Sequence, residues 1–447
     1  MTYEDAIEYL LTFADFERSG RFQDRPDVAP MLALLRELGD PHLGRVTVHI
    51  AGSKGKGSVA AMVESCLRAA GHGTGLYTSP HLHSYCERIR VDGQPISETQ
   101  FAALVEAVQP AVERLTEQLG ERRLVTFDLL TAMAFLAFRQ REVDVQVLEV
   151  GLGGRVDSTN VFETKDLAVI TPLSLEHTAI LGDDIESIAR EKAAIITPQC
   201  TIVMAPQTDP GAGRTVRDAV KAASARLIDV AGQYRWRVLD HDLRGQTLRI
   251  ERSEGAVEVW LPLIGGHQAE NAATAVACID ALRGSRDTAL SGTDEDIARG
   301  LSAVQWHGRM EVLREHPLVI ADGAHNGESA RRLVEALREY VRVDRATFIV
   351  ACLGDKDVAA LAAEIAPMAE RVFATQTAHP RAMNPSQIVA SFRGSGVPTD
   401  TCDSVKSAVD KAIDVTQPDG VICLLGSLSV AAAGREYLLR VGVRARG

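Results

Sequence analysis

One glycine- and lysine-rich segment contains the residue types best suited to binding phosphate: Gly52, Ser53, Lys54, Gly55, Lys56, Gly57 and Ser58. Glycines let backbone amides approach phosphate oxygens, and the N-terminus of a following helix favours anions. Lys56 would neutralise the outer phosphates, and Ser58 could ligate Mg²⁺. The usual loop has Ser or Thr directly after Gly-Lys, whereas here Gly57 intervenes. The pattern favours a variant nucleotide-binding loop over a glycine-rich turn with solvated lysines.

An acidic residue, Glu149, stands at the end of the apolar run 144–148. P-loop enzymes keep a metal-holding acid at this end of a strand. The alternative is a solvent-facing carboxylate at the edge of a sheet. Three glycines follow, with Arg155, Asp157 and Asn160, and this combination suits a tight polar pocket better.

Two more loops follow apolar runs and carry polar residues. Ser79, Pro80 and His81 come after the run 74–78, where a structural turn is the favoured interpretation of that stretch alone. His177 comes after the run 167–171. His177 could be a ligand, although a lone histidine in a loop more often lies on the surface.

A lysine interrupts an apolar stripe on the helix expected after Asp184, which can cap that helix. Lys192 therefore points inward. It is either a lysine that extends its amine to water near a helix end, or a buried lysine whose shifted pKa suits covalent or metal chemistry. The residues of the stripe are Ile185, Ile188, Ala189, Lys192, Ala193 and Ile196.

The last third of the chain repeats the same arrangement. Asp322 and His325 follow the apolar run 318–321, and polar loops at 354–357 and 426–429 follow two later runs. In open α/β sheets, ligands bind outside the carboxyl ends of the strands. This part of the chain should therefore also contribute to a site.

The elements that position these loops alternate between short apolar runs and longer helical patterns, such as the stripe over 58–70. Runs that are apolar at every position indicate parallel strands covered on both faces. We expect an α/β fold with a P-loop-type, doubly wound, mostly parallel sheet, a small antiparallel patch over 233–262, and a second, smaller Rossmann-like α/β domain. The expected domains are 1–306 and 307–447. The strand candidates are 45–51, 74–78, 144–150, 167–171, 201–205, 318–321, 347–353, 372–376 and 421–425.

Composition excludes several classes of protein. The chain has 447 residues, 46% of them hydrophobic and 24% charged, as in soluble globular proteins. Its net charge of −12 argues against a general nucleic-acid binder. It contains no apolar run of about 18 residues, and its acidic start does not resemble a signal peptide. Seven scattered cysteines fit reduced thiols in a cytoplasmic protein.

Six blocks in order resemble the folylpolyglutamate synthase / dihydrofolate synthase family, relatives of the Mur ligases, over almost the whole chain. That family's loop reads G-T-N-G-K-G-S, so Gly57 belongs to its version of the motif. The other blocks are "YTSPHLHSYCERIRVDG", "LEVGLGGRVDSTN", "GGHQAENAATA", "WHGRMEVL" and "DGAHN".

The resemblance implies an ATP-dependent ligase. ATP would phosphorylate a folate carboxylate, L-glutamate would attack the acyl phosphate, and phosphate would leave. The acceptor would be dihydropteroate, a reduced folate or both, and the protein would be a monomer. Domain closure would complete the site and exclude water.

The resemblance also implies residue roles. Lys56 would bind ATP phosphates, with Asn271, Arg309 and Asp322 as further nucleotide contacts. Ser79, Glu149 and His177 would hold one Mg²⁺. This role replaces the turn interpretation of Ser79 and makes Ser58 a less favoured Mg²⁺ ligand. Lys192 would be carbamylated and would help to hold a second Mg²⁺. His325 and Asp322 would act from the second domain, and the expected substrate contacts are Pro80, His81, Arg155, Asp157 and Ser427.

Four departures separate this chain from the family pattern. The family usually has Thr and Asn in place of Ser53 and Lys54, Asp in place of Glu176, and Glu in its Thr-Phe-x-Glu motif, where Asp128 is nearest here. They leave every core catalytic group in place and bear on the preference for pterin or glutamate.

Two rival functions remain. A Mur ligase would need a separate N-terminal domain of about 100 residues for a UDP-sugar, and the phosphate loop begins too early for one. An NTP-driven switch or ATPase without ligase activity would release phosphate from ATP without glutamate or folate.

Overall fold

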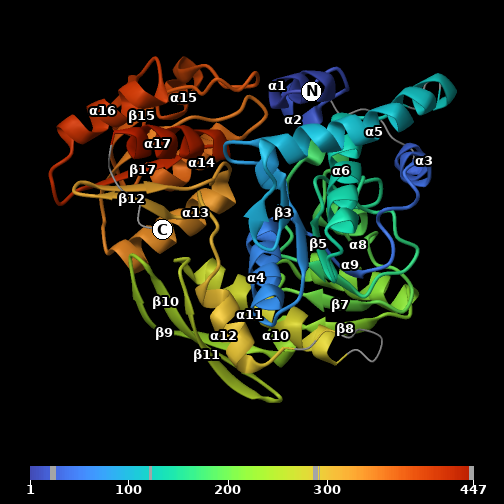
Figure 1. Cartoon of the computed structure of the whole chain (residues 1–447). Coiled ribbons are helices and arrows are strands. Elements are labelled where there is room, and N and C mark those ends of the chain that lie inside the picture. Colours follow the sequence, from blue (N-terminus) through green and yellow to red (C-terminus); the bar gives the residue numbers. More distant parts are fainter. Residues whose placement is uncertain (21–26, 120–122, 285–289, 291, 442–447) are drawn as a thin grey trace.

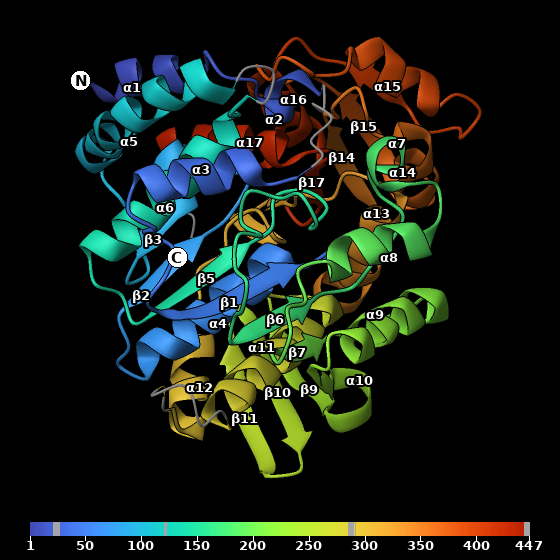
Figure 2. The ribbon, with the colours of Figure 1, turned by 90° about the vertical axis from the view of Figure 1, so that its right-hand side faces the viewer.

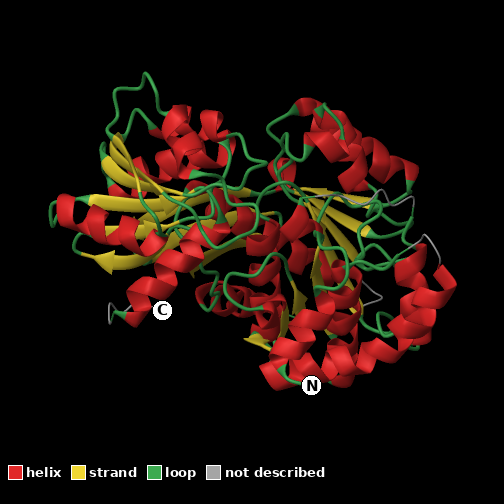
Figure 3. Cartoon of the chain, turned by 90° about the horizontal axis from the view of Figure 1, so that it is seen from above, coloured by secondary structure: helices red, strands yellow, loops and turns green. Residues whose placement is uncertain are grey.

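Two sheets, each covered by helices on both faces, organise the chain (Figure 1 and Figure 3). This computed structural model describes residues 1–20, 27–119, 123–284, 290 and 292–441. Strands alternate with helices in both halves of the chain, and most strand pairs are parallel. The expected α/β fold class is confirmed.

The larger sheet has eight strands in the order β4-β3-β2-β5-β1-β6-β7-β8. The pairs from β2 to β8 are parallel, and β3 and β4 add an antiparallel edge. The five strand candidates in this half are confirmed, whereas the three short strands at the edges lack a long apolar run and escape prediction. The bounds are β1 (Val46–Ala51), β2 (Thr74–Tyr77), β3 (Ile89–Val91), β4 (Gln94–Pro95), β5 (Val145–Glu149), β6 (Leu167–Ile170), β7 (Thr201–Met204) and β8 (Arg226–Asp229).

Helices cover both faces of this sheet (Figure 2). One face packs against α4, α11 and α12, and the other against α1, α3, α5, α6, α8 and α9. The helical bounds are α1 (Tyr3–Leu10), α2 (Phe16–Ser19), α3 (Ala29–Glu37), α4 (Lys56–Ala69), η1 (Tyr85–Arg88), α5 (Glu98–Leu119), α6 (Thr126–Gln140), α7 (Thr178–Leu181), α8 (Ile185–Ala193), α9 (Pro210–Ala222), α10 (Val230–Gln233), α11 (Gly266–Arg283) and α12 (Asp294–Ser302).

A small antiparallel sheet forms where alternation predicts one. It consists of β9 (Arg235–Asp242), β10 (Gly245–Arg252) and β11 (Gly255–Leu261), in the order β11-β10-β9. Leu248, Val257 and Val259 belong to the same buried core as α4 and α11. The patch therefore covers the helices on one face of the larger sheet.

The second sheet has six strands in the order β12-β13-β17-β14-β15-β16. It begins at Glu311, earlier than the apolar pattern restarts near 318, because β12 is a partly polar strand paired antiparallel with β13. The remaining pairs are parallel. The bounds are β12 (Glu311–Glu315), β13 (Leu318–Ala321), α13 (Gly327–Ala336), η2 (Leu337–Val341), β14 (Ala346–Val350), α14 (Val358–Ile365), β15 (Ala369–Ala374), α15 (Pro385–Ser391), β16 (Thr399–Thr401), α16 (Val405–Val415), β17 (Val421–Leu425) and α17 (Leu428–Arg440).

The cysteines are core residues. All seven are buried and none forms a disulfide bond, as their scattered positions indicate. Within the described part of the chain, no helix combines the length and the apolar character needed to cross a membrane.

Candidate active site

A cavity of about 860 Å³ lies between the two sheets. Its walls are the loops that follow β1, β2, β5 and β6 of the larger sheet and β13, β14, β15 and β17 of the smaller one. The predicted site residues that line it are Ser53, Lys54, Gly55, Lys56, Gly57, Ser58, Ser79, Pro80, His81, Glu149, Asp157, His177, Lys192, Asn271, Arg309, Asp322, His325 and Ser427. Strand ends far apart in the sequence thus meet in one place, as expected for an α/β fold.

The phosphate loop connects β1 directly to α4. The helix begins at Lys56, two residues earlier than its apolar stripe indicates, so Gly57 and Ser58 lie in its first turn. Lys56 Nζ donates to the carbonyl oxygen of Gly52 at 3.2 Å, and this bond folds the side chain over its own loop. The lysine ammonium group and the N–H groups at the start of α4 are donors of the kind that favour an anion.

Two glycines of the loop are required by space. Gly52 has φ +152°, and a Cβ there would lie 1.8 Å from Thr171 Oγ1. A Cβ on Gly57 would lie 2.7 Å from Trp306 Cζ2 and 3.3 Å from Glu149 Oε2. The extra glycine of this loop subtype therefore lets α4 approach both the Glu149 carboxylate and the Trp306 indole ring.

Glu149 ends β5 inside the cavity and is 5% exposed. Its Oε2 accepts a hydrogen bond from the backbone N–H of Ser79 at 3.2 Å. Burial raises the pKa of the Glu149 carboxyl, against the opposing charge of Lys56. A buried carboxylate in this state gains from a bound cation, so the solvent-facing alternative is wrong.

His177 lies on the same cavity and not on the open surface. It has φ +49° and precedes α7, and its ring lies 6.5 Å from the ring of Phe16. Burial lowers its pKa to about 4, so the imidazole is neutral at pH 7. Neutral imidazole is the form that binds metals.

The residues present fit a magnesium ion through the chemistry of their donors. Ser79, Glu149 and His177 offer a hydroxyl, a carboxylate and a neutral imidazole on one cavity. In the described parts of the chain, no three histidine, cysteine, aspartate or glutamate side chains gather closely enough to form a metal cluster. The expected set contains only two residues of those types, and its hydroxyl is a hard oxygen donor that suits Mg²⁺.

Lys192 is buried, with a side chain 2% exposed. Asp184 caps its helix, as expected. Lys192 Nζ pairs with Glu176 Oε1 at 2.9 Å and donates to the carbonyl oxygen of Gly52 at 3.0 Å. Burial lowers the pKa of the lysine, although Glu176 opposes this shift. The inward orientation is confirmed, and the alternative of an amine extended to water is wrong.

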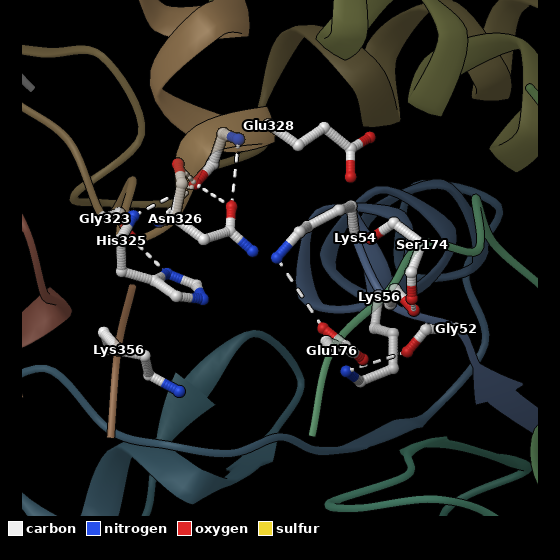
Figure 4. Close-up of polar contacts among 12 residues, drawn as sticks. Gly52, Lys54, Lys56, Ser174, Glu176, Gly323, His325, Asn326, Glu328 and Lys356 are labelled. Carbon is white, nitrogen blue, oxygen red and sulfur yellow. Dashed lines mark hydrogen bonds and ion pairs between the residues drawn. The ribbon is translucent and has the colours of Figure 1, made fainter. Parts of the chain in front are cut away.

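Glu176 also faces Lys54, whose Nζ lies 3.6 Å from Oε2 (Figure 4). Burial alone would raise the pKa of Glu176, but Lys192 and Lys54 hold it well below the ordinary value. Two of the departures from the family pattern, Lys54 and Glu176, are therefore partners. The additional cation sits beside a carboxylate and not free in the loop.

The smaller sheet presents Asp322 and His325 from the loop after β13. Asp322 accepts backbone N–H groups of Met310 at 2.8 Å and Ala324 at 2.7 Å. His325 Nδ1 donates to the carbonyl oxygen of Gly323 at 2.9 Å, because a carbonyl can only accept. Burial, with Lys54 as the next cause, lowers the pKa of His325 to about 3. Figure 4 shows His325 and Lys356 facing the loop lysines across the cavity.

The expected nucleotide contacts adjoin the phosphate loop. A Cβ on Gly55 would lie 2.5 Å from Asn271 Oδ1, so the α11 amide touches the loop backbone. Arg309 Nη1 donates to the carbonyl oxygen of Gly308 at 2.9 Å. Both side chains line the cavity beside the loop.

Four of the five expected substrate contacts line the cavity: Pro80, His81, Asp157 and Ser427. Arg155 does not: its side chain is 54% exposed and pairs with Glu191 at 2.9 Å. The backbone N–H of Arg155 also donates to the carbonyl oxygen of Glu191 at 3.1 Å, so both parts of the residue contact α8.

Asp128 has a structural role in its helix. It accepts the backbone N–H of Val125 at 2.9 Å and the hydroxyl of Ser158 at 2.7 Å, and it is fully buried. Its neighbours Thr126 and Phe127 line the cavity, whereas Asp128 does not. This departure therefore changes a contact between α6 and the glycine loop.

Four residues of the cavity wall were not predicted from the sequence. They are Phe16 and Glu17 on α2, Arg88 in η1, and Arg381, which lies several residues beyond the end of β15. Arg88 belongs to the "ERI" run of a family block, which was the one signal available.

Two family models match the chain. The Mur ligase middle domain matches residues 50–279, and the Mur ligase glutamate ligase domain matches residues 308–428. The first covers the phosphate loop and the larger sheet up to α11, and the second covers most of the smaller sheet.

Named relatives and a solved structure agree with these matches. A Halobacterium salinarum protein named probable bifunctional folylpolyglutamate synthase/dihydropteroate synthase is 37% identical over 98% of this chain, which spans 52% of that protein's length. A Mycobacterium tuberculosis protein named dihydrofolate synthase/folylpolyglutamate synthase is 35% identical over 93% of this chain and 90% of its own.

The crystal structure of Mycobacterium tuberculosis folylpolyglutamate synthase complexed with ADP and AMPPCP has a TM-score of 0.87 to this chain. It is 33% identical and covers 99% of this chain and 100% of its own. The two Mur ligase domain matches, the relative at 35% identity over 93% of this chain and the solved structure at 33% identity over 99% of it show that this chain belongs to the folylpolyglutamate synthase / dihydrofolate synthase family of Mur ligases.

Proposed function

We propose that this protein is an ATP-dependent ligase that joins L-glutamate to a folate carboxylate. The observation that carries the proposal is the single cavity that brings together Lys56, Glu149, Lys192 and His325. A nucleotide site alone does not account for His325 and Ser427, which the smaller sheet adds to the same space.

ATP would bind at the phosphate loop. The first turn of α4 and Lys56 hold the phosphates, and Asn271 and Arg309 lie where the rest of the nucleotide would pass. The γ-phosphoryl group would move to the acceptor carboxylate, which leaves ADP and an acyl phosphate. The amine of glutamate would then form the amide bond and release phosphate.

The acceptor would occupy the opposite end of the cavity, near α2. Apolar and aromatic side chains suit a flat pterin ring and the benzoyl group that follows it. The residues of this end are Leu11, Phe16, Tyr85, Val125, Phe127 and Leu130. Dihydropteroate and reduced folates share these groups, so the proposal includes both as acceptors.

Magnesium would neutralise the phosphate charge and polarise the transferred group when bound. Ser79, Glu149 and His177 would hold one ion. Lys192 carries the proposed carbamate, which would supply an oxygen ligand for a second ion. Its depressed pKa supports this, because the neutral amine is the form that combines with CO₂.

The second sheet would bind glutamate and exclude water. His325 is a neutral imidazole at pH 7, and Ser427 caps α17 at the cavity wall. Closing the two halves over the acyl phosphate would protect it from hydrolysis. We further propose units 1–306 and 307–447, a monomeric protein, a cytoplasmic location and no nucleic-acid partner.

The test is a set of parallel reactions with ATP, Mg²⁺ and glutamate, each with dihydropteroate, tetrahydrofolate or no pterin. We expect a product heavier by one glutamyl residue in the mass spectrum, and ADP release that depends on pterin and glutamate. ATP hydrolysis at the same rate without either substrate, and no glutamylated product, would establish the ATPase alternative instead.

A further inference from the structure

The short helix α2 contacts both halves of the molecule (Figure 1). The backbone carbonyl oxygen of Glu17 accepts two hydrogen bonds from Arg381, from Nε at 3.0 Å and from Nη2 at 2.7 Å. Arg381 lies after β15 and is 364 positions away in the sequence. Its remaining terminal nitrogen, Nη1, donates to Asp355 Oδ1 at 2.8 Å. The smaller sheet therefore holds the backbone of α2 through an arginine of fixed orientation.

The side chain of the same residue reaches in the other direction. The Glu17 carboxylate pairs with both terminal nitrogens of Arg88: Oε1 accepts from Nη1 at 3.1 Å, and Oε2 accepts from Nη2. Arg88 is buried, with a side chain 3% exposed. A buried guanidinium needs such a partner, because an unpaired buried charge is costly.

Arg88 in turn fixes the orientation of His81, a residue of the cavity wall. Its Nε donates to His81 Nδ1 at 2.9 Å. A guanidinium can only donate, so Nδ1 of His81 is the acceptor and the ring proton lies on Nε2. His81 packs on the ring of Tyr85, with 4.3 Å between the ring centroids. His81 therefore brings to the cavity wall an N–H donor whose orientation and tautomer are fixed.

We propose that Glu17 is a positioning residue that makes the acceptor subsite depend on docking of the smaller sheet. Arg381 holds the backbone of Glu17, the Glu17 carboxylate holds Arg88, and Arg88 fixes His81 as a donor toward the acceptor substrate. The recognised group is a hydrogen-bond acceptor, such as a carbonyl oxygen or a ring nitrogen of the pterin or benzoyl moiety. This inference rests on the proposed ligase function.

The position of α2 supports a role in substrate recognition beyond holding the two halves together. Phe16, the residue before Glu17, lies in the cavity wall and contacts the ring of His177. One helix thus carries an apolar contact to the acceptor subsite, a carboxylate that orders His81, and the docking point for Arg381.

The first test is the kinetics of Arg381→Ala and Glu17→Gln. Arg381→Ala loses both hydrogen bonds to the Glu17 carbonyl oxygen and the one to Asp355, and Glu17→Gln loses the carboxylate charge that pairs with Arg88. We therefore expect the KM for the pterin to rise about tenfold in each variant. The KM for ATP should stay close to the wild-type value in both variants, and so should the thermal unfolding midpoint of Arg381→Ala. Glu17→Gln leaves the buried Arg88 without a counter-charge, so its unfolding midpoint should fall. Arg381→Lys, which keeps one donor, should recover part of the affinity.

The matched control is Arg331→Ala, which removes another arginine–glutamate pair of the smaller sheet at a side chain 49% exposed. It should leave both KM values unchanged. A double variant sharpens the test: in a His81→Ala background, Arg381→Ala should raise the KM for the pterin by less than about twofold, because the donor that it positions is gone.

Three results would overturn the inference: equal rises in the KM values for ATP and pterin, effects that simply multiply in the double variant, or a wild-type pterin KM in both single variants. A wild-type enzyme that forms no glutamylated product with any pterin would instead refute the proposed function. Direct titration of pterin binding in the absence of ATP separates the two cases.

Discussion

At the scale of single residues, Lys192 shows how a charge can be buried in the wall of the cavity between the two sheets. Among the residues that the structure describes, its ammonium group has Glu176 and the backbone carbonyl oxygen of Gly52 as hydrogen-bond partners. Burial makes deprotonation easier, and the cavity is the place where a modified lysine could meet a metal ion. A structural ion pair would not need to line the cavity.

We predict that Lys192→Ala lowers kcat by about a hundredfold or more, the scale of losing one electrostatic contributor to a transition state. Arg190→Ala, on the exposed face of the same helix, is the control and should keep kcat. Activity should return in part when formate or acetate is added to Lys192→Ala. Carbon-13 NMR of wild-type protein under labelled CO₂ should show a carbamate signal that Lys192→Ala lacks. A fully active Lys192→Ala protein would refute the metal role.

Lys54 is the cation that the family pattern does not anticipate. Its Nζ is buried and has no hydrogen-bond partner among the residues that the structure describes, apart from the ion pair with Glu176 at 3.6 Å. Such an ammonium group is available to a phosphate oxygen.

We predict that Lys54→Asn raises the KM for ATP about tenfold and leaves kcat unchanged, because one charge-assisted contact to the nucleotide is lost. Lys54→Arg keeps the charge, so its KM for ATP should lie between those of the wild-type protein and Lys54→Asn. Initial rates at varied ATP concentration decide the question: an unchanged KM for ATP in Lys54→Asn contradicts the role.

At the scale of elements, the junction of β1 and α4 depends on glycine for two different reasons. Gly52 adopts a backbone conformation that residues with a side chain rarely take. Gly57 has an ordinary helical backbone, but there is no room for a side chain at its position. The indole of Trp306, which follows α12, fills that space. The first turn of α4 can therefore meet Glu149 only if residue 57 has no side chain.

We predict that Gly57→Ala lowers the free energy of unfolding by about 1–3 kcal/mol, the usual cost of overpacking, and weakens ATP binding. Gly232→Ala is the control, because no atom lies within 4 Å of its added Cβ. Urea unfolding and nucleotide titration measure the two effects. A Gly57→Ala protein as stable as Gly232→Ala would show that Trp306 moves aside without cost.

At the scale of the whole molecule, the site exists only where two sheets meet. The larger sheet supplies the phosphate loop, Glu149 and Lys192, and the smaller sheet supplies Asp322, His325 and Ser427. Neither half lines the cavity alone. The contact of Arg381 with α2 joins the same two halves at the end of the cavity where α2 lies.

A buried lysine outside the cavity, Lys165, should make the free energy of unfolding depend on pH. Lys165 is 6% exposed, and burial lowers its pKa to about 7 from the ordinary 10.5. Its Nζ lies 2.9 Å from Nδ1 of the buried His49. Between those two pKa values, the unfolded chain binds a proton on Lys165 that the folded protein does not.

We therefore predict that stability rises with pH from about 7 to 10 through this lysine, because the unfolded state holds more protons in that window. Below pH 7 the cost of burying the charge is fully present. The free energy of unfolding of Lys165→Met should depend less on pH over this window. Urea unfolding at each pH compares the slopes, and identical slopes in the two proteins would contradict the assignment.

Local patterns identified much of this architecture. The apolar runs marked the main parallel strands, and the polar residues after them marked the phosphate loop, Glu149, His325 and the Lys192 helix. Periodicity and strand ends are local properties, so a single chain reveals them. The order of family blocks added the roles that residue types alone left open.

Only the tertiary structure decided which side chains meet. Arg155 shares a motif with Asp157, but its side chain is exposed and pairs with Glu191 of α8. Lys54 and Glu176 became partners, and Gly57 met Trp306, through the packing of separate loops. Glu17 and Arg381 meet across 364 positions. The sequence by itself determined the fold class, the nucleotide loop and the set of polar strand ends, whereas contacts between distant segments depend on how the two sheets pack, which no local pattern encodes.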